Sequence, residues 1–319
     1  MILLGGIPSE RPVAMLTDAL DELGAPYRLF DQRRCAGCAF AFEIGTDGVS
    51  GTLDLHGEIF DTAAFTAIYL RLMDDRILPE LENEPEGSPA RRHSRALHDA
   101  LYRWIEVADA RVVNRSDPQG SNSSKPYQAQ LIASHGLGVP ETLITTDPAE
   151  VLAFRRLRGA IIYKSMSGVR SIVRQLNEAD IARLGTIGWC PVQFQALVPG
   201  NDVRVHVIGD VVHATEILSD VTDYRYARQQ GGTTELRAIE LPRDLAARCI
   251  ALTAGLGLVF AGIDLRIGPD GEATCFEVNP SPAFSYYQAN TDQPIATTLA
   301  RYLAGWNTTA SLATTPPNA

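Results

Sequence analysis

The sequence has little that could carry the chain into or across a membrane. No stretch of its 319 residues reaches the roughly 18 uncharged apolar residues of a membrane span. The first residues, MILLGGIPSERP, have no basic leader and only a short apolar run. Hydrophobic residues make up 45% and charged residues 21%, which excludes a collagen-like, coiled-coil or disordered chain. We expect a cytoplasmic protein with no membrane partner, built from two or three domains of about 150 residues each.

Lysine is nearly missing. Of the 28 basic residues, 26 are arginine, and only Lys125 and Lys164 are lysine. A chain that uses arginine for its surface cations keeps lysine where a compact point charge on a slim stem is needed. A phosphate in a narrow pocket is such a place, because a guanidinium is larger and planar. Chance survival of either lysine is the alternative.

Cysteine is sparse and irregularly spaced. Cys35 and Cys38 form one CxxC pair, and no second pair or histidines at zinc-finger spacing follow. We expect two ordinary thiols in a loop, with redox use of the pair as the alternative. The net charge of −10 excludes a general attraction to nucleic acid. A Walker A loop and the nucleophile elbow G-x-S-x-G are both absent, which excludes a P-loop site.

The first 113 residues alternate short apolar runs with helical periodicity. This βα alternation favours a mostly parallel sheet. The segment 80–95 follows Pro79, contains Pro85, Gly87 and Pro89, and is expected to be an exposed loop that leads into the next helix. The polar run RSDPQGSNSSK marks a boundary near residue 115. Strands are predicted at 2–6, 27–30, 53–60, 67–72 and 111–114, and helices at 12–23 and 94–108.

The pattern changes beyond residue 115. Two hairpins stand out: DVRVHVIGDVVHATEI, which turns at Gly209 and Asp210, and AGIDLRIGPDGEATCFEVNP, which turns at PDG. The last residues, 307–319, are polar and predicted to be disordered. Helices are predicted at 123–135, 245–256 and 294–306, and further strands at 160–164 and 191–197.

The second hairpin carries the clearest chemical signal. Glu277 and Asn279 are two residues apart, so both project from the same face of a strand. Asp264, on the first strand, can reach that face across the turn. Two carboxylates and an amide oxygen form an all-oxygen set that suits Mg²⁺ shared with substrate phosphates. The alternative is an exposed polar hairpin face with no ligand.

Four segments together resemble the ATP-grasp superfamily, especially its RimK and glutathione-synthetase-like branch. DLRIGPDGEATCFEVNPSP resembles the family's metal-binding hairpin, and VQFQALVPGNDVRVHVIG resembles its adenine hinge followed by the Asp-x-Arg strand. SKPYQAQLIASHGLGVPET and AIIYKSMSGVRS resemble the segments that carry the two ATP lysines. The order agrees, and the only two lysines fall on the family positions. The resemblance is strong over residues 114–305.

This resemblance implies the fold. We expect an α/β (α+β) ATP-grasp protein in which two α+β subdomains sandwich ATP. Residues 1–113 are similar only in general βα character to the preATP-grasp domain that usually comes first. The expected parts are 1–113 as that domain, 114–194 as the central subdomain with the lysines and phosphate loop, 195–306 as the C-terminal subdomain with the metal hairpin, and 307–319 as the tail.

The resemblance also implies the ligands of ATP and Mg²⁺. Two metal ions are expected, with Mn²⁺ as a substitute, held by Asp264, Glu277 and Asn279. The backbone of Ala196 and Leu197 would read the adenine edge; the family often has Glu at the position of Ala196, so a side-chain contact is absent here. The implied ATP-binding residues are Lys125, Lys164, Ser165, Ser167, Gly168, Gln195, Ala196 and Leu197.

Other polar residues are assigned by analogy or by position. Arg204 and Arg266 would clamp the transferred phosphoryl group, and ion pairs with Asp202 and Asp264 are the alternative. His206 and His213 are expected to be solvent-facing strand residues. Candidate substrate contacts are Arg71, Arg170 and Arg225.

The function implied is that of an ATP-dependent carboxylate–amine ligase. The γ-phosphate passes to a carboxylate, and an amine attacks the acyl phosphate to form an amide, releasing ADP and phosphate. Small-molecule or peptide acids and amines are the expected substrates, and a homo-oligomer is expected. One alternative is an ATP-grasp maturase that links a ribosomal peptide through amide or ester bonds. A second alternative is a non-catalytic nucleotide-binding scaffold, although no metal ligand or phosphate lysine is missing.

Overall fold

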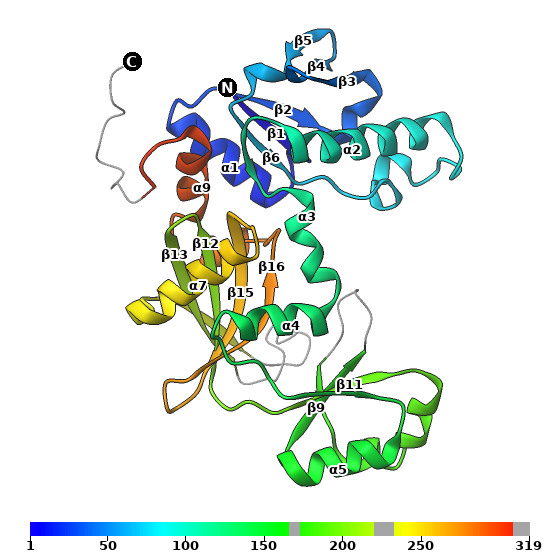
Figure 1. Cartoon of the computed structure of the whole chain (residues 1–319), viewed down its shortest axis with the longest axis vertical. Helices are drawn as coiled ribbons and strands as arrows, with labels where there is room; N and C mark the ends of the chain where they lie inside the picture. The colour runs from blue at the N-terminus through cyan, green and yellow to red at the C-terminus, as the bar shows by residue number, and fades with distance from the viewer. Residues whose placement is uncertain (166–172, 220–232, 309–319) are drawn as a thin grey trace.

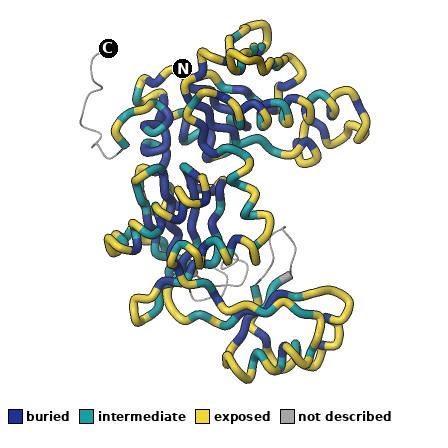
Figure 2. The backbone as a smooth tube through the Cα atoms, in the orientation of Figure 1, coloured by how far each residue is buried: buried dark blue, intermediate teal, exposed yellow. Residues whose placement is uncertain are grey.

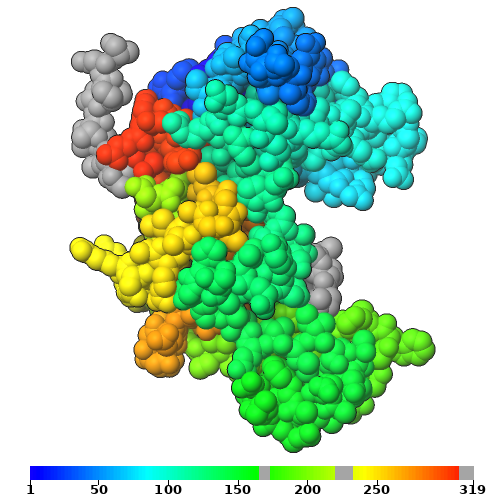
Figure 3. All heavy atoms as spheres, viewed as in Figure 1, coloured from blue at the N-terminus to red at the C-terminus, as the bar shows by residue number. Residues whose placement is uncertain are grey.

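The structure, a computed structural model, describes residues 1–165, 173–219 and 233–308. It has four β-sheets with helices packed on them, so the mixed α/β class is confirmed. Figures 1 and 3 show three masses along the long axis: residues 1–113 at one end, the C-terminal sheet in the middle and the central sheet at the other end. Within the described residues, no helix is both long enough and apolar enough to cross a bilayer.

The N-terminal part contains the predicted parallel sheet, in the order β2-β1-β6-β7. Alternate residues of β1 point to opposite faces: Ile2 and Leu4 pack with α1 and α9, and Leu3 packs toward α2. Figure 2 shows the central strands β1 and β6 of this sheet as buried. The elements are β1 (Ile2–Gly6), α1 (Arg11–Glu22), β2 (Tyr27–Asp31), β6 (Ala67–Leu70), α2 (Pro89–Val107) and β7 (Arg111–Val113).

A second, antiparallel sheet departs from the prediction of one strand at 53–60. It consists of β3 (Cys38–Gly45), β4 (Gly48–Leu55) and β5 (Glu58–Asp61). His56 and Gly57 have φ of 59° and 92°, which turns the chain sharply and divides the predicted strand in two. Cys35 and Cys38 are not in a loop as predicted: Cys35 lies in the 3-10 helix η1 (Gln32–Gly37), and Cys38 is the first residue of β3. Both are buried, and burial raises the pKa of the Cys38 thiol. A thiol held in its neutral form does not favour redox use.

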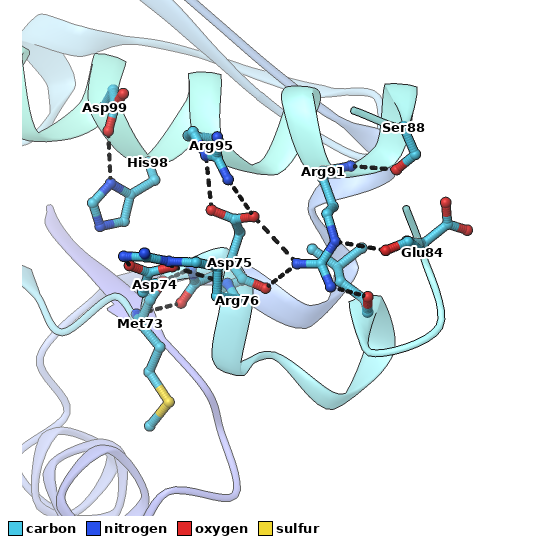
Figure 4. Close-up of polar contacts among 12 residues, drawn as sticks. Met73, Asp74, Asp75, Arg76, Glu84, Ser88, Arg91, Arg95, His98 and Asp99 are labelled. Atoms are coloured by element: carbon cyan, nitrogen blue, oxygen red, sulfur yellow. Dashed lines mark hydrogen bonds and ion pairs between the residues drawn. The ribbon is translucent and has the colours of Figure 1, made fainter. Parts of the chain in front are cut away.

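The expected exposed loop at 80–95 is present at 82–87, but it ends earlier than predicted, because α2 already begins at Pro89 and buries Arg91 and Ser94 in its first two turns. Asp75, at the start of the short 3-10 turn η3 (Asp75–Ile77), accepts two hydrogen bonds from Arg95, at 2.9 and 3.1 Å, and one from Arg91 at 3.3 Å (Figure 4). Arg91 also donates to the carbonyl groups of Asp75, Leu81 and Glu84. These long-range contacts fasten the segment after β6 to α2.

The C-terminal sheet is antiparallel, in the order β14-β13-β12-β15-β16. One face packs against α4 and α7, and the other partly against α8 and α9. Both predicted hairpins are present. The elements are α4 (Lys125–Ser134), β12 (Asn201–Ile208), β13 (Val211–Ser219), β14 (Thr234–Ile239), α7 (Arg243–Gly255), β15 (Phe260–Ile267), β16 (Ala273–Asn279), α8 (Ser285–Thr291) and α9 (Ile295–Ala304).

The central sheet is antiparallel, in the order β10-β9-β11-β8. Its last strand, β11, runs to Ala196, so the predicted boundary between residues 194 and 195 falls inside a strand. Helix α4, assigned by sequence to the central part, packs on β16 instead. The elements are α3 (Ser116–Gln119), β8 (Thr142–Thr145), α5 (Pro148–Arg158), β9 (Ile161–Ser165), β10 (Arg174–Gln175), α6 (Glu178–Ile181) and β11 (Val192–Ala196).

His206 and His213 are not the solvent-facing residues that the sequence suggested. They pair across β12 and β13, on the face that α8 and α9 cover. The His206 ring is fully buried and lies 5.0 Å from the ring of Tyr287, and the His213 Nε2 atom lies 2.9 Å from Thr298 Oγ1. Burial lowers the pKa of His213 to about 4 and holds that of His206 well below its usual range. The helices that shield this face come 80 to 90 residues later in the chain.

We predict that Asp75→Ala lowers the free energy of unfolding by about 3 kcal/mol, because it leaves the buried Arg91 guanidinium without its charge partner. Asp74→Ala is the matched control. It removes an exposed pair with Arg76 and is expected to cost less than about 1 kcal/mol. Urea unfolding of both variants measures the difference. Equal losses would show that the Asp75 pair is not a structural anchor.

We predict that His213 contributes to acid sensitivity. Its pKa of about 4 in the folded state lies below the ordinary value near 6.5, so protonation favours the unfolded chain. The free energy of unfolding therefore falls by up to about 3 kcal/mol between pH 6.5 and 4 and levels off below that range. Replacing the ring by His213→Gln should remove this part of the slope. An unchanged pH profile in denaturant titrations would contradict the assignment.

Candidate functional site

The hairpin of β15 and β16 brings its polar residues together through a β-bulge. Asp264 lies opposite Glu277, but the next residue, Leu265, lies opposite Cys275, so Phe276 is an extra residue in β16. Cys275 and Val278 both point into the core under the sheet. The extra residue therefore turns Glu277 to the other face, beside Asp264.

The donor set fits a hard divalent cation. Asp264 and Glu277 have side chains that are 38% and 29% exposed, so their oxygens are accessible from one side. Asn279 Oδ1 accepts a hydrogen bond from the Ser281 N–H at 2.9 Å, which orients the amide and leaves its oxygen a second lone pair. All three ligand atoms are oxygens, as Mg²⁺ prefers. The side chains are compatible with the predicted metal role.

Lys125 lies at this group. It is the first residue of α4, and its Nζ atom is 2.8 Å from Glu277 Oε1. The two residues are 152 positions apart in the sequence. Their contact shows that the packing of α4 on β16 places the first of the two lysines at the carboxylates.

Lys164 lies on the face of the central sheet that is opposite α5. Ile161, Tyr163 and Phe194 pack toward α5, so Lys164 projects from the other face, which looks toward the rest of the molecule (Figure 1). Gln193 lies directly across from Lys164 on β11 and is buried. Gln193 is not among the residues predicted from the sequence, although its spacing of two from Gln195 places both on one strand face.

The hinge after β11 modifies the adenine prediction. The N–H of Ala196 donates to the Glu141 carbonyl at 3.0 Å, and that of Leu197 donates to the Ala160 carbonyl at 2.9 Å. Both donors are therefore engaged within the protein, and only the carbonyl groups of these residues could read an adenine edge. Among the described residues, the N–H of Val198 has no hydrogen-bond acceptor, which makes it a donor candidate that the sequence did not single out. Gln195 is buried and donates to Thr142 Oγ1 at 2.9 Å.

Arg204 and Arg266 form the ion pairs that stood as the alternative reading. Arg204 contacts Asp264 Oδ1 at 2.5 Å, and Arg266 contacts Asp202 Oδ1 at 2.6 Å. The Arg204 guanidinium passes over Gly262, where a Cβ atom would lie 2.4 Å from Arg204 Nη2. It also lies over the Tyr287 ring. Both arginines thus lie on the same sheet face as Asp264, and a phosphoryl-binding role for them stays a prediction.

Arg71, a predicted substrate contact, is hydrogen-bonded to other residues of the protein. Its Nε donates to Glu10 Oε1 at 2.7 Å, and its Nη1 donates to Ser281 Oγ at 2.8 Å. These contacts make it a link between β6 and the segment after β16.

Ser165, a predicted ATP-binding residue, ends β9 and pairs through its backbone with Val192. The remaining predicted residues lie outside the described part of the chain: Ser167, Gly168, Arg170 and Arg225.

A cavity of about 740 Å³ opens beside the Arg266–Asp202 pair. Its walls come from the start of β12, the end of β13 and the start of β14, and they combine carboxylates, hydroxyl groups and two aliphatic side chains. Such a lining suits a polar substrate with charged groups better than an apolar one. The lining residues are Gly200, Asn201, Asp202, Ile217, Leu218, Ser219, Thr233, Thr234, Glu235 and Arg266.

Known proteins share this fold over nearly the whole chain. The ATP-grasp ligase PsnB, solved with a minimal precursor, Mg and ADP, is 30% identical, with a TM-score of 0.76 over 95% of this chain and 96% of that one. A RiPP-associated ATP-grasp ligase from Chryseobacterium gregarium, solved with ADP and a leader and core peptide, has a TM-score of 0.78 over 95% of this chain and 96% of that one. At 20% identity it supports the fold alone.

Sequence relatives agree on the family. A probable alpha-L-glutamate ligase from Rhodopirellula baltica is 28% identical over 64% of this chain, and the chain spans only 53% of that relative, about half its length. The sequence model of the RimK-like ATP-grasp domain matches residues 122–303, which contain all the predicted metal ligands and both lysines. The chain belongs to the RimK-like ATP-grasp family.

Proposed function

We propose that this protein is an ADP-forming ATP-grasp ligase that activates a carboxylate of a peptide and links it to an amine or hydroxyl group. The observation that carries this proposal is the extent of the likeness. PsnB, which was solved with its precursor, is 30% identical over 95% of the chain, whereas the glutamate ligase aligns with 64% of it at 28% identity. This likeness to a ligase solved with a peptide supports a peptide substrate.

The site supports this chemistry group by group. Lys125, on α4, and Lys164, on β9, are the cations that would neutralise phosphate charge. Asp264, Glu277 and Asn279 would hold Mg²⁺, which offsets phosphate charge and favours in-line transfer to the carboxylate. Arg266, on β15 of the hairpin, also lines the 740 Å³ cavity, where it can attract the carboxylate that is to be activated.

The alternative within this class is a ligase that joins free small-molecule acids and amines, as the alpha-L-glutamate ligase names suggest. The two are separated by incubating the protein, ATP and Mg²⁺ with a short peptide encoded beside its gene, and separately with glutamate as donor and acceptor. A peptide that loses one water mass per link, with matching ADP release, supports the proposal. ADP release with glutamate alone contradicts it.

We also propose that the protein is a homo-oligomer and that it is located in the cytoplasm. Light scattering tests the oligomeric state, and cell fractionation tests the location.

We predict that Glu277→Gln folds normally but loses most turnover, because it removes one negative charge from the metal ligands and keeps the side chain's shape. With wild-type protein, ATP, Mg²⁺ and the peptide, hydroxylamine should trap the acyl phosphate as a hydroxamate. The variant should give little, even at saturating ATP. A fully active variant would contradict the metal role, and AMP with pyrophosphate as products would contradict phosphoryl transfer.

We predict that Lys164→Arg weakens binding of a non-hydrolysable ATP analogue at least tenfold, since the planar guanidinium is bulkier than an ammonium on a strand whose facing residue, Gln193, is buried. The control is Arg156→Lys, an exposed exchange on α5, which should leave binding unchanged. Calorimetric titration measures both. Wild-type affinity in Lys164→Arg would rule out the steric argument.

A further inference from the structure

The strand that carries Glu277 and Asn279 is at the edge of its sheet. In the described structure β16 pairs with β15 on one side, and the other side of its backbone has no strand along it beyond an isolated bridge at Thr274. An edge strand presents N–H and C=O groups that need partners when they are buried. At Val278, between Glu277 and Asn279, these groups are shielded from solvent by α4.

One side chain satisfies both groups of Val278. The Val278 N–H donates to Gln128 Oε1 at 2.9 Å, and Gln128 Nε2 donates to the Val278 carbonyl at 2.8 Å. Gln128 is only 2% exposed. Its amide thus takes the place that a peptide group of a sixth strand would occupy. Two hydrogen bonds from one planar group fix the orientation of the backbone at Val278, and with it the directions of Glu277 and Asn279.

The same side chain also fixes the helix. Gln128 lies one turn after Lys125 on α4, so the two side chains project from the same face of the helix. Gln128 reaches Val278 while Lys125 reaches Glu277 at 2.8 Å. The helix can shift along β16 only by breaking both contacts. A single amide therefore sets the distance between the first lysine and the carboxylate of the hairpin.

We propose that Gln128 is a positioning residue of the ligase: it holds the metal-binding strand and the phosphate-binding lysine in register with each other. It contacts neither nucleotide nor metal. The proposal rests on the proposed function, since it assigns Glu277 and Asn279 to a cation and Lys125 to a phosphate. If Gln128 only filled the core, its loss would impair folding but would not selectively weaken the binding of the cation.

The test compares Gln128→Met with Gln130→Met in the full chain. Methionine has a similar length and no amide, and Gln130 is exposed on the same helix. Mn²⁺ affinity is measured by electron paramagnetic resonance at saturating ADP, and ADP affinity is measured without metal. Gln128→Met should lower the Mn²⁺ affinity at least about tenfold, as the loss of residues that orient metal ligands does. It should lower the ADP affinity less. Gln130→Met should match the wild type.

A second variant keeps the test decisive if the methionine variant does not fold. Gln128→Asn retains a polar amide but is one methylene too short to span both groups of Val278. Circular dichroism establishes that it is folded, and hydrogen exchange of the 273–279 segment should be faster in it. Wild-type Mn²⁺ affinity in a folded Gln128 variant overturns the inference alone. A wild-type protein that binds no Mn²⁺ with ADP overturns the proposed function and the inference together.

Discussion

The extra residue in β16 is the constraint on which the candidate site depends. In a regular strand Glu277 would share the face of Cys275, which is in the core. The bulge at Phe276 keeps Cys275 and Val278 buried and still turns Glu277 toward Asp264. It therefore reconciles two demands on five consecutive residues: an apolar layer against α4 and α7, and a row of oxygen ligands on the opposite face.

Ion pairs make this cluster of acids tolerable before any ligand arrives. Asp264 is paired with Arg204, Glu277 with Lys125, and Asp202 with Arg266. Partly buried carboxylates without partners would repel each other and resist ionisation. The Glu277 pair differs from the Arg204 pair in exposure, because the Arg204 side chain is only 8% exposed and the Lys125 side chain is 33% exposed. In the proposed function, this accessible ammonium would turn to a phosphate and leave Glu277 to a metal ion.

Much of this site could be predicted from the sequence because its chemistry lies in short local motifs. The spacing of Glu277 and Asn279 and the two surviving lysines needed no knowledge of packing. What the sequence could not show depends on partners that are distant along the chain. Gln128 and Val278, which are hydrogen-bonded, are 150 residues apart. The hydrogen bond from the Ala196 N–H to the Glu141 carbonyl forms only once the central sheet has assembled. The same limit explains the misplaced start of α2, because Arg91 in its first turn is buried by contacts with the segment after β6.

The N-terminal part contacts both ends of the hairpin that carries the candidate metal ligands. Arg71, just after β6, donates a hydrogen bond to Ser281 Oγ at 2.8 Å. The amide of Asn114, just after β7, donates to the Pro280 carbonyl at 2.7 Å. Asn114 also accepts the N–H groups of Val259 and Phe260, at the start of β15. Both ends of the hairpin are thus anchored to residues at the carboxyl ends of parallel strands. The parallel sheet of residues 1–113 therefore helps to fix both ends of the hairpin, because the anchoring residues Arg71 and Asn114 follow directly on two of its strands.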